Sequence, residues 1–159
     1  MIQTVGSISP HFAWHEVTRS ATATARGIDN TIPPEWRPAA LMVAHQMEEV
    51  RALLGVPVVV SSWYRSPALN RVVGGERNSA HLMAGAQDWI AGGGMPLREA
   101  YRRVADSGLP FDQLIIERAK SGAEWIHAGW IVRPRQSVLV AAWDEALRHM
   151  TFRQRLAEG

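Results

Sequence analysis

The sequence contains no cysteine among its 159 residues. Disulfides and thiolate metal sites are therefore excluded, and any metal ligands must come from histidine, aspartate or glutamate. Lysine occurs once, at Lys120, so arginine carries nearly all the basic charge, and the formal net charge is only +2. The arginines are dispersed and form no stripe with interleaved aromatic residues, which argues against a nucleic-acid partner. We interpret them as a solvated surface rather than a site for an anionic polymer.

Long apolar runs are also missing. No stretch approaches the roughly 20 residues that a membrane span needs, and Met1 to Ser9 lacks the basic start and apolar run of a signal peptide. We therefore expect a protein made in the cytoplasm, without stable membrane insertion, that something else must deliver if its substrate lies outside. The length predicts a single domain over residues 1–159, and we expect a monomer.

The periodicity indicates helices early in the chain and strands in its middle and late parts. This order favours an α+β domain, with a mostly antiparallel sheet and helices packed on one face. The short polar turn at 118–123 predicts an antiparallel hairpin, and residues 144–156 are ambiguous between helix and strand. We expect helices over residues 11–26, 36–54, 66–73 and 97–106, and strands over 56–64, 84–90, 111–117, 124–132 and 137–143.

The segment 36–54 has the strongest helical pattern and ends at Gly55. Its predicted core face contains Leu41, Ala44, His45, Met47, Val50 and Leu54. We expect the histidine on this face to be a packed core residue. His11 and His15 lie four apart in the first predicted helix, which suits metal ligands, but histidines at helix starts are more often surface residues.

A histidine and an aspartate, His81 and Asp88, stand seven positions apart with small or apolar residues filling most of the gap. From Ala84 to Ile90 the polar and apolar residues roughly alternate, which predicts a half-buried strand and places Asp88 among apolar neighbours. A carboxylate is costly to bury unless it is paired or bound to a metal.

Glu124 and His127 follow on a second strand-like run. Side chains three apart on a strand point to opposite faces, so we expect a bulge or strand end that turns Glu124 back toward His127. His81, Asp88 and His127 would form the two-imidazole, one-carboxylate set of a catalytic zinc with an open fourth position. Glu124 would then be left as the general base. Spacing alone is weak evidence, because His-x6-Asp is common by chance.

Several blocks of the sequence, taken together, resemble one family. They are Ser-x-His-x6-Asp at 79–88, Glu-x-x-His at 124–127, Ser-Ser-Trp-Tyr-Arg-Ser-Pro-Ala-Leu-Asn at 61–70, Val-Gly-Gly at 73–75, Gly-Leu-Pro-Phe-Asp-Gln-Leu-Ile at 108–115, and the opening at 11–30. From about Phe12 to Trp130 the chain resembles the zinc D-alanyl-D-alanine peptidases of the M15 type, in their phage and prophage branch.

The resemblance implies the α+β fold that these peptidases share with the hedgehog signalling domain. It implies Zn²⁺ held by His81, Asp88 and His127. It also implies Glu124 as the base and Arg65 as the group that steadies the substrate carbonyl. Ser79, Gln113 and Tyr64 are our candidate substrate-binding residues, although Ser79 is equally well explained as a structural turn residue.

The implied substrate is the stem peptide of bacterial peptidoglycan. Both a D-Ala-D-Ala carboxypeptidase and an L-Ala-D-Glu or cross-link endopeptidase fit, as does a phage-type endolysin that acts on the cell wall after release. The alternative is a non-catalytic, zinc-containing phage structural or cell-wall-binding module. Glu124 and Arg65 favour the enzyme, because a purely structural zinc needs neither.

One position departs from the family pattern. The family usually has glycine three residues after the first histidine, where this chain has Ala84 followed by Gly85. Alanine is small enough for that place, but it would be strained if the backbone required a positive φ.

Overall fold

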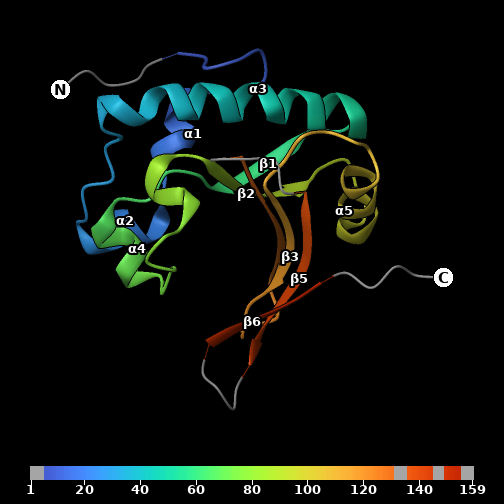
Figure 1. Cartoon of the computed structure of the whole chain (residues 1–159). Coiled ribbons are helices and arrows are strands. Elements are labelled where there is room, and N and C mark those ends of the chain that lie inside the picture. The colour runs from blue at the N-terminus through green and yellow to red at the C-terminus, as the bar shows by residue number, and fades with distance from the viewer. Residues whose placement is uncertain (1–5, 131–135, 145–148, 155–159) are drawn as a thin grey trace.

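A computed structural model describes residues 6–130, 136–144 and 149–154 of the chain. These residues form one sheet with helices around it, in agreement with the predicted α+β class (Figure 1). The helices are α1 (Trp14–Thr18), α2 (Ala21–Arg26), α3 (Arg37–Leu54), α4 (Pro67–Val72) and α5 (Leu97–Ala105), with 3-10 turns η1 (Pro34–Trp36) and η2 (Ala80–Met83). The strands are β1 (Val58–Ser62), β2 (Ala86–Ala91), β3 (Gln113–Arg118), β4 (Glu124–Gly129), β5 (Ser137–Asp144) and β6 (His149–Gln154).

The sheet has the strand order β1-β2-β4-β3-β5-β6. Every pairing is antiparallel except that of β3 with β5. The predicted hairpin is β3–β4, in which Arg118 lies opposite Glu124. A mostly antiparallel sheet is therefore confirmed, while the finer hedgehog-type arrangement stays a prediction.

The two faces of the sheet have different roles. Trp89, Leu114 and Ile126 are buried in one core with Val43 and Met47 of α3, the long helix that lies across the sheet in Figure 1. Neighbouring residues on a strand point to opposite faces. The polar side chains next to these core residues are therefore directed to the other face, where the candidate site lies.

Helix α3 confirms the predicted segment but not all of its predicted core face. It ends at Gly55, whose φ of 68° is the left-handed cap that glycine adopts readily. Leu41 is 40% exposed and His45 is also exposed, so the interpretation of His45 as a core residue is wrong. At about 100° per residue they lie about 120° and about 160° around the helix from the fully buried Met47. The buried stripe is therefore narrower than the predicted one.

The predicted helix over 11–26 is two short helices, α1 and α2. The chain is extended at Ser20, with φ −154°, and the Ser20 side chain accepts a hydrogen bond from the backbone N–H of Ala23 at 3.2 Å. Serine is a favoured N-cap, so it starts a second helix instead of continuing the first. The second helix ends at Gly27 as expected.

The last part of the chain is described only in pieces. β5 confirms the strand predicted over 137–143, and residues 149–154 of the ambiguous segment are the strand β6. The last residues of the strand predicted over 124–132 lie outside the described residues, as do 145–148 and 155–156 of the ambiguous segment.

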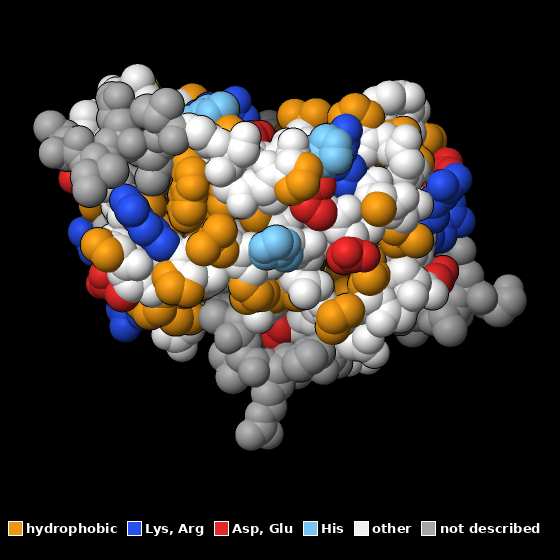
Figure 2. All heavy atoms as spheres, turned by 90° about the horizontal axis from the view of Figure 1, so that it is seen from above, with side chains coloured by type: hydrophobic (Ala, Val, Ile, Leu, Met, Phe, Trp, Pro, Cys, Tyr) orange, Lys and Arg blue, Asp and Glu red, His pale blue; other side chains and the backbone are white. Residues whose placement is uncertain are grey.

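The distribution of charge on the surface agrees with the prediction that the arginines are dispersed. On the face seen in Figure 2, basic side chains stand in separate groups among apolar and acidic ones. Within the part of the chain that the structure describes, no helix combines the length and apolar character needed to cross a membrane.

Candidate metal centre

Three predicted ligands come together on the face of the sheet opposite to α3. His81 is on η2, while Asp88 of β2 and His127 of β4 are direct cross-strand partners. Asp88 Oδ1 lies 3.1 Å from His81 Nε2 and 2.9 Å from His127 Nδ1, and the two nitrogens are 3.2 Å apart. Among the described residues, this is the one group of three or more His, Cys, Asp or Glu side chains whose ligand atoms lie close enough together to hold a metal ion.

The donor set fits a small tetrahedral cation. Ligand bonds of about 2.0–2.2 Å place the donor atoms of a tetrahedral zinc about 3.3–3.6 Å apart. The observed separations of 2.9–3.2 Å are shorter by only a few tenths of an ångström, so small outward rotations would suffice. All three residues are buried, and three protein ligands leave a fourth position for substrate or water.

The backbone fixes the orientation of His81. Its Nδ1 lies 2.5 Å from the carbonyl oxygen of Trp63, a distance at which Nδ1–H donates to that oxygen. This tautomer leaves the lone pair on Nε2, the atom that faces Asp88 and His127. The carbonyl of Trp63, the residue that follows β1, therefore fixes both the tautomer and the ring orientation of His81.

The charges of the site are strongly coupled. Burial lowers the pKa of His81. Burial also opposes the charged form of Asp88, but the charge of His81 and hydrogen bonds from both histidines hold the pKa of Asp88 well below its ordinary value. For His127 burial is outweighed by the hydrogen bond and charge of Asp88, which raise its pKa. A deprotonated carboxylate between two imidazoles is the state that binds a cation.

Arg65 reaches the same carboxylate from the loop after β1. Its terminal nitrogen donates to Asp88 Oδ2 at 2.5 Å, and its Nε donates to Ser62 Oγ at 3.0 Å. One oxygen of Asp88 is therefore engaged by the guanidinium, and the other faces the histidines. The predicted contact of Arg65 with a substrate carbonyl stays a prediction.

Glu124 does not lie beside the histidines. The β3–β4 register runs without interruption from Glu124 to Gly129, so the bulge predicted to turn Glu124 toward His127 is absent there. Glu124 is on the helix-covered face, 31% exposed, and its carboxylate lies 3.6 Å from Arg98 of α5. The geometric part of the prediction is wrong because strand alternation holds at a three-residue spacing. The irregularity is instead in β1, between Val60 and Ser62.

A carboxylate missed in the sequence, Glu117, lies on the same face of the sheet as the candidate ligands. In the hairpin register Ile115 is opposite His127, and Glu117 is two residues farther along β3 on the same face. Burial and the negative charge of Asp88 raise the pKa of Glu117 to about 7, while His127 and Arg65 act in the opposite sense. The signal available in the sequence was the hairpin itself, because pairing across the turn at 118–123 fixes which residues share a face.

The comparison with known families agrees with this geometry. The family model for peptidase M15 matches residues 10–128, which include Glu117 and all three ligand residues. The chain belongs to the peptidase M15 family. A search among curated proteins found no match.

Of the three candidate substrate-binding residues of this M15 peptidase, only Gln113 is placed where it could contact a substrate. Gln113 is half-buried and begins β3 on the face of Glu117. The Ser79 hydroxyl accepts from the backbone N–H of His81 at 3.3 Å and so caps η2, which supports the structural reading. Tyr64 is only 3% exposed and lies in the core, so it has almost no surface to offer a substrate, and this prediction is corrected.

Ala84 has the positive φ that alanine tolerates poorly. It ends η2 with φ 54° and ψ 19°, the left-handed conformation. Its side chain is fully buried in the core. Left-handed backbone costs a non-glycine residue about 1–2 kcal/mol, so the M15 peptidase is strained three residues after its first ligand.

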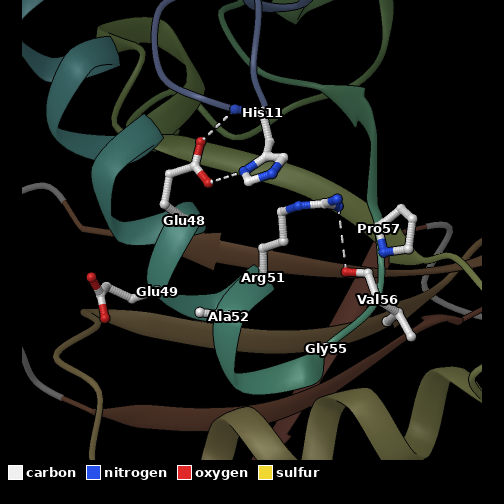
Figure 3. A pocket seen from close by; sticks show the side chains of 8 residues that line it. All are labelled: His11, Glu48, Glu49, Arg51, Ala52, Gly55, Val56 and Pro57. Atoms are coloured by element: carbon white, nitrogen blue, oxygen red, sulfur yellow. Dashed lines mark hydrogen bonds and ion pairs between the residues drawn. The ribbon is translucent and has the colours of Figure 1, made fainter.

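A separate hollow of about 430 Å³ lies between the end of α3 and the start of β1 (Figure 3). His11 borders it, and its Nδ1 is 2.7 Å from Glu48, whose other oxygen accepts from the His11 backbone N–H and from Ser9. His11 thus fastens the N-terminal segment to α3. This contact explains the histidine without a metal.

Proposed function

We propose that this M15 peptidase is a zinc enzyme that hydrolyses the stem peptides of bacterial peptidoglycan. The observation that carries the proposal is the buried group of His81, Asp88 and His127, with donor atoms 2.9–3.2 Å apart, in a chain of this family. When bound there, zinc would supply a Lewis acid that makes water a nucleophile near neutral pH.

Glu117 is the residue best suited to move the proton. Its pKa of about 7 lets it accept a proton at neutral pH and donate it again to the leaving amine. Glu124, engaged with Arg98 on the opposite face, is not available for this role without a change of fold. We therefore transfer the role of base from Glu124 to Glu117.

Arg65 has two tasks in this proposal. It holds Oδ2 of Asp88 and so directs Oδ1 toward the metal position. Its charge would also stabilise the negative charge that develops on the carbonyl oxygen of the cleaved bond. Gln113, on the same face, is a candidate donor or acceptor for the peptide.

The substrate class rests on the family resemblance and not on the geometry. D-Ala-D-Ala carboxypeptidase and L-Ala-D-Glu or cross-link endopeptidase activities both fit, in a phage-type endolysin that reaches the cell wall after release and acts as a monomer. The competing function is a non-catalytic wall-binding module that keeps the metal. Glu117 speaks against it, because a structural metal needs no carboxylate of neutral pKa beside its ligands.

The test is a digest of purified peptidoglycan followed by mass spectrometry of the released peptides. The zinc-loaded protein should release fragments, a chelator should stop release, and added zinc should restore it. Glu117→Gln and Glu124→Gln form the matched pair, of which only the first should be inactive. Zinc binding without any released fragment would instead support the wall-binding module, and the masses of released fragments would identify the bond.

A further inference from the structure

Arg65 lies in a short stretch that belongs to no strand or helix, between the end of β1 at Ser62 and the start of α4 at Pro67. A long side chain on an irregular segment is aimed accurately only if its backbone is held. We propose that Asn30, which lies 35 positions earlier in the chain, is a positioning residue that fixes Arg65. The inference rests on the proposed function in one respect, the action of Arg65 at the metal site.

The Asn30 amide grips the chain on both sides of Arg65. Its Oδ1 accepts from the backbone N–H of Ser66 at 2.7 Å, and its Nδ2 donates to the carbonyl oxygen of Tyr64 at 3.1 Å. Nδ2 also donates its second hydrogen to the carbonyl oxygen of Thr18 at 2.9 Å. Asn30 is 7% exposed, so these bonds are sheltered from water.

Only a primary amide matches this set of partners. Two carbonyl oxygens and one N–H require two donors and one acceptor on a short side chain, which is the inventory of asparagine. Aspartate has the same shape but would turn an acceptor toward two carbonyl oxygens. A serine would keep at most part of the set.

The surrounding bonds transmit this grip to the metal site. The backbone N–H of Arg65 donates to the carbonyl oxygen of His81 at 3.0 Å, so the backbone that Asn30 holds is also joined to a ligand residue. The Arg65 side chain then reaches Ser62 and Asp88. Displacing this backbone by about 1 Å would move the guanidinium off Asp88, and displacements of that size can cost about a hundredfold in rate.

The first experiment needs no activity. The Nε–Hε signal of Arg65 is followed by NMR in the zinc-loaded full chain and is assigned by its loss in Arg65→Lys. It should be shifted and broadened in Asn30→Asp and in Asn30→Ser, which introduces no buried charge. It should be unchanged in Val43→Ala, a variant destabilised in the core on helix α3, whose side chain makes none of the hydrogen bonds around Arg65. An unchanged signal in both Asn30 variants, or the failure of both to fold, would overturn the inference.

The second experiment is a double-mutant cycle in kcat/KM at saturating zinc. Asn30→Ser should lower kcat/KM at least about tenfold in the wild-type background and less than about twofold in the Arg65→Ala background, because it acts through Arg65. Equal losses in both backgrounds would refute the positioning role. A wild-type protein without hydrolysis would refute the proposed function instead, and the NMR comparison would still decide the role of Asn30.

Discussion

Replacing Glu117 by glutamine should stabilise the metal-free protein at pH 8 while abolishing hydrolysis by the zinc-loaded protein. Burial beside Asp88 raises the pKa of this carboxyl from 4.5 to about 7. A pKa difference of one unit corresponds to 1.36 kcal/mol, so the full difference is worth about 3 kcal/mol. Glu117 is half-buried, and contact with water reduces this energy. We therefore expect Glu117→Gln to raise the free energy of unfolding at pH 8 by about 1–3 kcal/mol.

The sign follows from proton binding. Between about pH 4.5 and about 7 the folded protein keeps the Glu117 proton and the unfolded chain releases it, so stability falls as the pH rises through this window. Glutamine does not titrate. The two proteins should therefore be similar in stability near pH 4 and should diverge up to about pH 7, with Glu117→Gln more stable above it. Loss of the charge will also lower the pKa of His127, which Glu117 helps to raise.

The assay is urea unfolding in the presence of a chelator at pH values from 4 to 8, paired with the peptidoglycan digest of the zinc-loaded proteins. Glu124→Gln is the control, because its exposed ion pair contributes under about 1 kcal/mol. It should retain activity, whereas Glu117→Gln should lose turnover by about a hundredfold or more. Parallel stability curves for wild type and Glu117→Gln, or wild-type turnover in Glu117→Gln, would show that the argument about Glu117 is wrong.

Four further substitutions test the rest of the site. His81→Ala and His127→Ala should each lose bound zinc in metal analysis, and full zinc retention in both would refute the ligand set. Arg65→Ala should still bind zinc, about tenfold more weakly because Asp88 loses its partner, and should lose hydrolysis about a hundredfold; a wild-type rate would disprove its role. Ala84→Gly should change the free energy of unfolding by less than about 1 kcal/mol. Glycine relieves about 1–2 kcal/mol of backbone strain. It also removes a buried methyl group, which costs about 0.8 kcal/mol, and makes the unfolded chain more flexible, which costs about 0.4–1 kcal/mol. A change in urea unfolding of more than about 2 kcal/mol in either direction would contradict that balance.

The sequence, through its resemblance to the M15 peptidases, indicated the three residues of the candidate metal centre. His81 and Asp88 belong to one motif, and the alternation of polar and apolar residues in it places the carboxylate on a buried strand. His127, on a second strand, completes the group of three possible ligands. The strong helix ending at Gly55 and the hairpin at 118–123 were equally readable, because a left-handed cap and a short polar turn are local features.

Tertiary structure decided which carboxylate accompanies the ligands. Glu124 and Glu117 both lie close to His127 in the hairpin, and spacing along one strand favours Glu124, the nearer in sequence. Cross-strand register overrules that proximity, since alternation directs Glu124 to the face covered by α3 and α5 and Glu117 to the face that carries His81, Asp88 and His127. The grip of Asn30 on the backbone around Arg65 was likewise invisible, because a buried amide selects its partners by distance in space.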